Sequence, residues 1–293
     1  PVFVHGGPFA NIAHGCNSII ATKLAMQLAD YTITEAGFGT ELGAEKFFNI
    51  KCRKAGISPN AAVVVATIKS LKVHGGVEQK DVAQPNPKAV KEGIDNLKKN
   101  IENIQAFKVP VVVALNRFSH DADEEINIVK EQCDYLGVDV VLCTNWQDGG
   151  QGSIELARAV TDLCESQTSD FELLYDDDLS LLSKITKIAT EMYGANEILA
   201  DKQLRKDIKD LENQGFGHLP ICMAKTPGSL STDPNLKGAP TGHVLPIREI
   251  RLSSGAEFIV VVCGAIMTMP GLPRVPAADS IKLNNKGNIE GLF

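Results

Sequence analysis

The sequence lacks the short motifs that most directly identify a catalytic or metal site. None of its seven cysteines forms a Cys-x-x-Cys pair, and no set of His, Cys, Asp and Glu has the spacing of a zinc site. A Gly-x-Ser-x-Gly nucleophile motif, a Walker A loop and the dinucleotide-binding Gly-x-Gly-x-x-Gly are also absent. We therefore expect no metal site, and the function has to be inferred from longer patterns.

Long apolar runs and an excess of basic residues are missing as well. No apolar run is long enough to cross a bilayer, and no signal peptide is visible. The 36 acidic and 29 basic residues give a net charge of −7, which argues against a nucleic-acid-binding surface. An odd number of scattered cysteines indicates reduced thiols. We expect a cytoplasmic protein that binds neither nucleic acid nor membrane, although helix N-termini can still hold anionic small ligands.

The first half of the chain has the pattern of an α/β protein. Short β-branched runs at 61–67, 109–115 and 139–143 alternate with amphipathic helical patterns at 87–107 and 121–136. This alternation predicts βαβ units and mostly parallel sheets with flanking helices, in P-loop-NTPase-like or Rossmann-like layers. The run 61–67 is expected to be buried on both faces of its sheet.

The residue pattern changes after Gly215, where proline- and glycine-rich segments separate short apolar runs. These runs predict strands and a small C-terminal α/β or α+β subdomain. The strands are expected at 221–224, 244–252 and 257–266, with earlier helices at 18–28, 153–164, 179–193 and 202–213 and two early strands at 2–4 and 28–33.

A glycine-rich segment at 34–47 follows the predicted strand 28–33 and leads into a helix that starts near Leu42. Gly37, Gly39 and Gly43 let the backbone approach a neighbour closely, because glycine has no Cβ. Open parallel sheets bind ligands beyond the carboxyl ends of their strands. The segment is therefore either a structural strand-to-helix turn or a ligand-binding loop.

Two aromatic residues follow neighbouring predicted strands. Phe118 comes just after the strand 109–115, and Trp146, the only tryptophan, comes just after 139–143. If 121–136 is a crossover helix, both rings emerge at one edge of the sheet, on strands ~5 Å apart or twice that. Two such rings can bracket a flat heteroaromatic ligand, which needs roughly 7 Å between the outer planes. The alternative is structural, with Phe118 anchoring a loop and Trp146 capping the core.

Histidine–glycine pairs and a pair of lysines leave further alternatives. His5-Gly6-Gly7 follows a predicted strand and is either a phosphate or substrate loop or an ordinary turn. Lys69 and Lys72 lie three residues apart on one predicted helical face, which favours a solvated surface over a phosphate clamp.

Several long segments resemble formate–tetrahydrofolate ligase, also called formyltetrahydrofolate synthetase. The segment Val-Ala-Thr-Ile-Lys-Ser-Leu-Lys-Val-His-Gly-Gly at 65–76 is close to a signature segment of that family. The similarity extends over essentially the whole chain, and its other motifs lie at 5–15, 34–47, 264–273 and 291–293.

This resemblance implies that ATP, with Mg²⁺, phosphorylates formate, and that N10 of tetrahydrofolate captures the formyl phosphate. The pterin of the family stacks between a phenylalanine and a tryptophan that correspond to Phe118 and Trp146, with Leu142 lining the folate pocket. A monovalent cation and a homo-oligomer are also implied. The nucleotide is expected near Ala10, Asn11, Phe38 and Gly43.

The phosphate-binding P-loop, the glycine-rich signature and the formyl-phosphate arginine of the family are not found in this sequence. We expect them in an N-terminal half that precedes Pro1, since the chain lacks an initial methionine. No catalytic residue is then expected here, and the chain alone should be inactive. The alternatives are a non-catalytic folate- or nucleotide-binding module and an assembly module. The expected units are 1–98, the rest of a nucleotide-binding domain; 99–218, a folate-binding domain; and 219–293, a small C-terminal domain.

Overall fold

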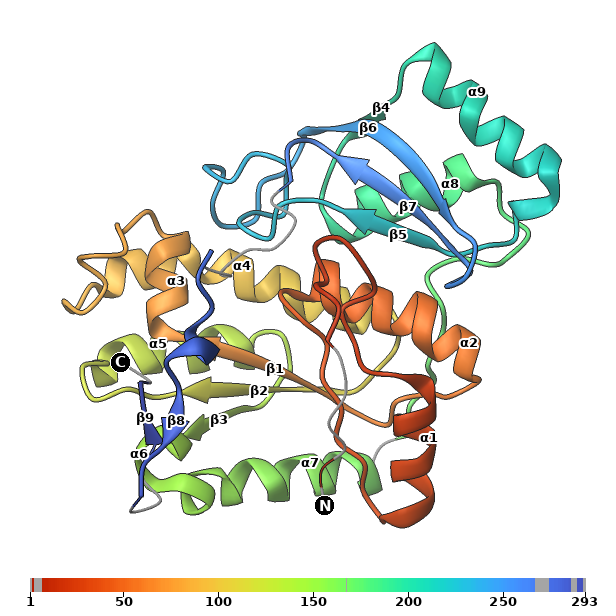
Figure 1. Ribbon diagram of the computed structural model, residues 1–293. Helices are drawn as coiled ribbons and strands as arrows, with labels where there is room; N and C mark the ends of the chain where they lie inside the picture. Colours follow the sequence, from red (N-terminus) through yellow and green to blue (C-terminus); the bar gives the residue numbers. More distant parts are fainter. Residues whose placement is uncertain (1, 3–6, 167, 267–273, 286–288, 292–293) are drawn as a thin grey trace.

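Two larger β-sheets organise the described part of the protein (Figure 1), and a third sheet pairs two short strands near the C-terminus. The computed structural model describes residues 2, 7–166, 168–266, 274–285 and 289–291. The first sheet is parallel, with strand order β1 (Ala62–Thr67), β2 (Val111–Asn116) and β3 (Val140–Cys143). The predicted α/β class and the parallel pairing of these three strands are confirmed.

Helices cover this sheet because their apolar stripes have the helical period. In α4 (Pro87–Gln105), Asn86 is the N-cap and its side chain accepts the N–H of Ala89 at 3.0 Å, with proline at the first helical position. The buried stripe of α4 faces β1 and β2, and α5 (Asp123–Asp134) forms the crossover from β2 to β3. In Figure 1, α4 and α7 (Ile154–Ser166) lie on opposite sides of the strands.

The expectation that residues 61–67 are buried on both faces is wrong. Val63 and Val65 are 40% and 63% exposed, whereas Val64 and Ala66 are buried in the core. The reason is the position of β1 at the edge of the sheet, while α7 packs on β2 and β3. One face of an apolar edge strand is therefore open.

The second sheet is mixed and lies above the first in Figure 1. Strands β6 (Val244–Ser253) and β7 (Phe258–Cys263) are antiparallel, and β5 (Ile221–Ala224) pairs in parallel with β7. These three strands confirm the predicted C-terminal sheet. The fourth strand, β4 (Glu197–Leu199), pairs with β6 and was not predicted. The helices beside this sheet are α8 (Leu181–Lys187), continued by a π-helix at Ile188–Met192, and α9 (Lys202–Leu211), continued by a π-helical segment at Glu212–Phe216.

Shorter elements complete the fold. They are α1 (Ile19–Leu28), the π-helices η1 (Thr40–Ala44) and η2 (Phe47–Cys52), α2 (Arg53–Ala55), α3 (Ile68–His74), α6 (Asn145–Asp148), the 3-10 helices Gly149–Ser153 and Ala277–Asp279, β8 (Lys282–Leu283) and β9 (Ile289–Glu290).

The predicted strand at 28–33 is wrong. Residue 28 ends α1, and residues 29–35 form no strand and have no ladder partner among the described residues. A strand needs a neighbour to satisfy its backbone, and Ile33 is instead 91% exposed. Of the strand predicted at 2–4, only Val2 is described, and the rest lies outside the described residues.

The two lysines predicted on a solvated face have different environments. Lys69 is exposed, but Lys72 is fully buried and its Nζ lies 2.7 Å from Oε1 of Glu125. Glu125 also accepts the backbone N–H groups of Asn86 and Ala122 at 2.7 and 3.0 Å. A buried charge needs such compensation, and one carboxylate here joins the starts of α4 and α5 to α3.

The predicted domain limits stay a prediction. Residue 98 lies within α4, between two strands of one sheet, and residue 218 lies shortly before β5. All seven cysteines are free thiols. Within the described part of the chain, no helix is both long and apolar enough to span a bilayer.

Candidate functional site

The aromatic pair lies at the carboxyl edge of the parallel sheet. Phe118 follows β2 and Trp146 lies on α6 directly after β3, and these two strands are neighbours. The ring centroids are 6.1 Å apart and the ring planes are tilted by 55°. The structure therefore brings together the two rings that the sequence places at one edge. A flat ligand between them requires the planes to become parallel and to separate to roughly 7 Å.

The loop that carries Phe118 is held by its own backbone and by Asp121. The N–H of Phe118 donates to Oδ2 of Asp121 at 2.8 Å, and the N–H of Asp121 donates to the carbonyl of Phe118 at 3.1 Å. The His120 ring is nearly parallel to that of Phe118, with centroids 6.1 Å apart. Asp121 is buried, so the loop is anchored to the protein interior. Phe118 is thus the fixed wall of the pair.

Trp146 is the exposed partner, with 75% of its surface accessible. Its helix is a single turn closed by the N–H groups of Gln147 and Asp148, which donate to the Thr144 carbonyl at 2.9 and 2.8 Å. After this turn the chain passes close to Thr144 again at Gly152. A Cβ there would lie 2.4 Å from the Thr144 carbonyl carbon, so this position requires glycine. The exposed ring has room to turn as a ligand enters.

Leu142 lies on β3 beside this edge. It pairs in register with Leu115 of β2 and is partly buried against the core. Its role in a folate pocket stays a prediction.

The residues expected near a nucleotide form a second, backbone-rich wall. Ala10 and Asn11 are buried, and the N–H of Gly37 donates to the carbonyl of Gly15 at 2.9 Å. A Cβ at Gly37 would lie 3.6 Å from Cβ of Ala10, and a Cβ at Gly43 would lie only 2.1 Å from the carbonyl oxygen of Gly37. The glycines therefore serve close backbone packing that joins Ala10 to Gly43.

The glycine segment forms a turn of π-helix, η1, and does not follow a strand. Phe38 precedes this turn with φ of 64° and is 46% exposed. A bulky residue in the left-handed region is strained, and such strain is concentrated at functional positions. The exposed ring beside Gly37 and Gly43 agrees with a ligand-facing role, which stays a prediction.

Lys46 holds the backbone of this wall in place through hydrogen bonds from the buried side. Its side chain is fully buried, and its Nζ donates to the backbone carbonyl of Ala10 and, at 3.1 Å, to that of Ala13. Both acceptors are carbonyls of the loop that carries Asn11, so the ammonium is used to hold the loop. Sequence reasoning missed Lys46 because nothing in the local pattern distinguishes it from a surface lysine.

The neighbouring carboxyl of Glu45 is fully buried too. Burial raises its pKa from 4.5 to about 7, against the opposing effects of a hydrogen bond from Asn49 and the charges of Lys46 and Arg53. The helical segment behind the wall therefore contains an acid that titrates near neutral pH.

The third predicted loop is only partly described. His5 and Gly6 lie outside the described residues, and Gly7 is exposed with open space at its Cα. A phosphate or substrate role for this loop stays a prediction. Among the residues that the structure describes, no group of three or more His, Cys, Asp or Glu is placed to hold a metal ion.

These features define an α/β protein with an aromatic pair at the carboxyl edge of a parallel sheet and a separate glycine-lined surface. A sequence profile described as formate–tetrahydrofolate ligase matches residues 1–293, and the chain belongs to that family. Three relatives named formate–tetrahydrofolate ligase align over all 293 residues of the chain. They are from Pelagibacter ubique (58% identical, 52% of the relative covered), Ruegeria sp. TM1040 (59%, 52%) and Granulibacter bethesdensis (56%, 51%). The chain spans about half the length of these relatives.

Proposed function

We propose that this chain forms the folate wall and part of the nucleotide wall of a formate–tetrahydrofolate ligase. In the proposed reaction, the γ-phosphoryl group of ATP passes to formate, and N10 of tetrahydrofolate then displaces phosphate from formyl phosphate. The observation that carries the proposal is the Phe118–Trp146 pair at the carboxyl edge of β2 and β3, in a chain of this family.

The pterin of tetrahydrofolate is proposed to stack between Phe118 and Trp146, with Leu142 beside it. Aromatic rings favour offset stacking on a flat heterocycle, and apolar surface is removed from water on both faces of the ligand. Phe118 is anchored through Asp121, whereas Trp146 is largely exposed. Entry of the pterin is therefore expected to move mainly the tryptophan.

The nucleotide wall is proposed to contact the adenine and sugar of ATP through Ala10, Asn11, Phe38 and Gly43. Lys46, the buried cation behind this wall, is occupied by two backbone carbonyls. The residues of this wall thus contribute a complementary surface for the nucleotide. The positive charge that phosphoryl transfer requires is proposed to come from an N-terminal half. Mg²⁺ bound with ATP and a monovalent cation are proposed as cofactors of the complete enzyme. No catalytic residue is assigned to this chain.

The same N-terminal half is proposed to cover the open face of β1. Val63 and Val65 are exposed on this edge strand, and α1 presents exposed Ile20 and Leu28. An apolar edge strand with free backbone groups readily pairs with another strand. The relatives from Pelagibacter ubique and Ruegeria sp. TM1040 are about twice as long as this chain, so a partner segment of suitable size exists in them.

The complete enzyme is proposed to act in cytoplasmic one-carbon metabolism as a homo-oligomer. Residues 1–98, 99–218 and 219–293 are proposed as its nucleotide, folate and C-terminal units.

Complementation tests the proposed function. The chain is mixed or co-expressed with the N-terminal half of the Pelagibacter ubique relative, and ATP-dependent formation of 10-formyltetrahydrofolate is measured. We expect activity from the pair and none from either part alone. A stable complex without activity would contradict the proposal, and folate binding without activity would identify the non-catalytic binding module instead.

A further inference from the structure

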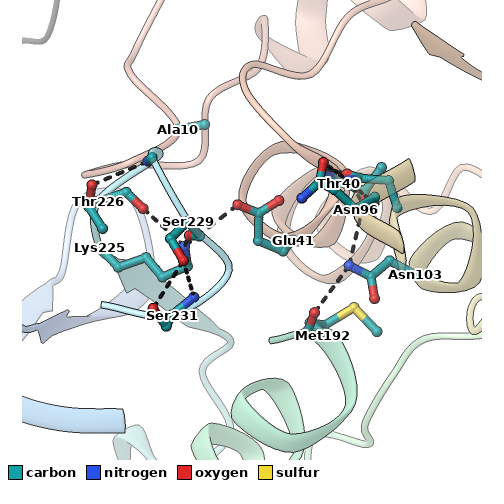
Figure 2. Close-up of polar contacts among 12 residues, drawn as sticks. Ala10, Thr40, Glu41, Asn96, Asn103, Met192, Lys225, Thr226, Ser229 and Ser231 are labelled. Atoms are coloured by element: carbon teal, nitrogen blue, oxygen red, sulfur yellow. Dashed lines mark hydrogen bonds and ion pairs between the residues drawn. The ribbon is translucent and has the colours of Figure 1, made fainter. Parts of the chain in front are cut away.

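A buried ion pair links the C-terminal sheet to the nucleotide wall. Nζ of Lys225 lies 3.5 Å from Oε1 of Glu41, and both side chains are almost completely shielded from solvent. Lys225 directly follows β5, whereas Glu41 lies on η1 between Gly39 and Gly43 (Figure 2). The pair thus joins two segments that are far apart in the sequence.

The surroundings of Lys225 fix the position of its ammonium group. Nζ donates to the carbonyl of Thr226 at 2.9 Å and to that of Ser229, and it lies 5.1 Å from the centroid of the Tyr193 ring. These neutral groups orient the ammonium, and Glu41 supplies the opposite charge. Removal of either charged partner leaves the other buried without compensation.

Glu41 is held against the glycine segment itself. A Cβ at Gly39 would lie 2.1 Å from Oε2 of Glu41, so the carboxylate folds back over the glycine backbone. On the opposite side, the backbone N–H and the hydroxyl of Thr40 donate to Oδ1 of Asn100 on α4 at 2.9 and 2.8 Å. The first turn of η1 is therefore hydrogen-bonded to α4 through Thr40 and ion-paired with Lys225 through Glu41.

The loop that follows Lys225 is docked a second time. The N–H of Gly238 donates to Nδ1 of His74 at 3.2 Å, and Nδ2 of Asn96 donates to the carbonyl of Gly238 at 2.9 Å. His74 ends α3 in the Val-His-Gly-Gly motif, and Asn96 lies on α4. The segment 225–238 is thus bound to η1 at one end and to α3 and α4 at the other.

We propose that Lys225 is a positioning residue for the nucleotide wall. Through Glu41 it holds residues 39–44, and thereby Gly43 and the backbone beside Ala10, in the arrangement that accepts the nucleotide. The C-terminal sheet then controls nucleotide affinity without touching the nucleotide. That the ligand of this wall is ATP rests on the proposed function, whereas the tether itself rests on the contacts described.

Amide hydrogen exchange on the chain tests the tether. Glu41→Gln preserves the size of the side chain, and Lys225→Met removes the ammonium; Lys184→Met is the matched control. Lys184 is equally buried, but its Nζ donates to carbonyls of residues 177, 217 and 219. Loss of the tether is expected to speed exchange at residues 40–44 by about tenfold in the first two variants, and to leave residues 118–121 unchanged. Unchanged exchange at 40–44 in Glu41→Gln, or equal acceleration in Lys184→Met, would overturn the proposal.

Kinetics of the complemented enzyme test the consequence. Glu41→Gln and Lys225→Met are expected to raise KM for ATP about tenfold, with kcat and KM for tetrahydrofolate little changed. The double variant should be no worse than the worse single variant, because both remove one interaction. An unchanged KM for ATP would overturn the proposed control of affinity. No activity in the unsubstituted complex would instead overturn the proposed function, and the exchange measurement would still decide the tether.

Discussion

Glu45 gives the structure a pH dependence that a single substitution should remove. The carboxyl is fully buried, its Oε1 accepts Nδ2 of Asn49 at 2.7 Å, and Oε2 has no hydrogen-bond partner among the described residues. Because burial disfavours the charged form, the pKa rises from 4.5 to about 7.

The sign of the effect follows from linkage. Between pH 4.5 and about 7, the folded protein keeps a proton at Glu45 that the unfolded chain releases. Stability therefore falls as the pH rises through this window, and the loss is complete above the folded pKa. The difference between the two pKa values corresponds to roughly 3 kcal/mol in the free energy of unfolding.

The perturbation is Glu45→Gln, which keeps the acceptor for Asn49 and removes the titration. Urea unfolding is measured at pH 5 and pH 8 for the variant, for the unsubstituted chain, and for Glu131→Gln. Glu131 is exposed on α5 and serves as the control. Glu45→Gln should gain roughly 2.5 kcal/mol relative to the unsubstituted chain between pH 5 and pH 8, because about a quarter of the total loss has already occurred at pH 5. A stability difference that does not change with pH would refute the assignment of the burial penalty to Glu45.

Three further predictions test packing, charge and the partner surface. Gly43→Ala is expected to cost roughly 1–3 kcal/mol by urea unfolding, because its Cβ would lie 2.1 Å from the Gly37 carbonyl oxygen; no loss would contradict the close packing. Lys72→Met is expected to cost about 3–5 kcal/mol by leaving the Glu125 carboxylate buried and unpaired, and the double variant with Glu125→Gln to cost less than the sum of the two single changes. Additive losses would show that the pair is not coupled. Val65→Lys adds a charge to the open face of β1, and it should abolish complementation by the N-terminal half while changing thermal unfolding of the chain by only a few degrees. Full activity of that variant would place the partner elsewhere.

The first sheet and its aromatic edge were predictable because their signals are local and periodic. The stripe of α4 and the β-branched runs at β1, β2 and β3 define the elements. The parallel order then places the ends of β2 and β3 at one edge, which is enough to predict that Phe118 and Trp146 lie close together. Their tilt of 55° was not predictable, because it depends on side-chain packing.

Other features depend on residues that the local pattern does not reveal. Residues 28–33 have the composition of a strand, but a strand forms only where a neighbour offers its backbone. Lys72 has the spacing of a surface lysine, and only the fold brings Glu125 to it. The Lys225–Glu41 pair likewise depends on tertiary packing, because it joins the residue after β5 to η1. A charged side chain is buried where a partner distant in sequence compensates its charge, and a single-sequence pattern does not identify that partner.

Binding of tetrahydrofolate between Phe118 and Trp146 is measured by titrating the chain with tetrahydrofolate and following the fluorescence of Trp146. Because Trp146 is the only tryptophan, any ligand-dependent signal reports on this edge of the sheet. We expect saturable quenching, with Kd raised about tenfold in Phe118→Leu because one stacking face is lost. The control Tyr135→Ala, which removes an exposed aromatic side chain after α5, should leave Kd unchanged. No quenching at saturating tetrahydrofolate, or equal Kd values for Phe118→Leu and the unsubstituted chain, would contradict the folate wall.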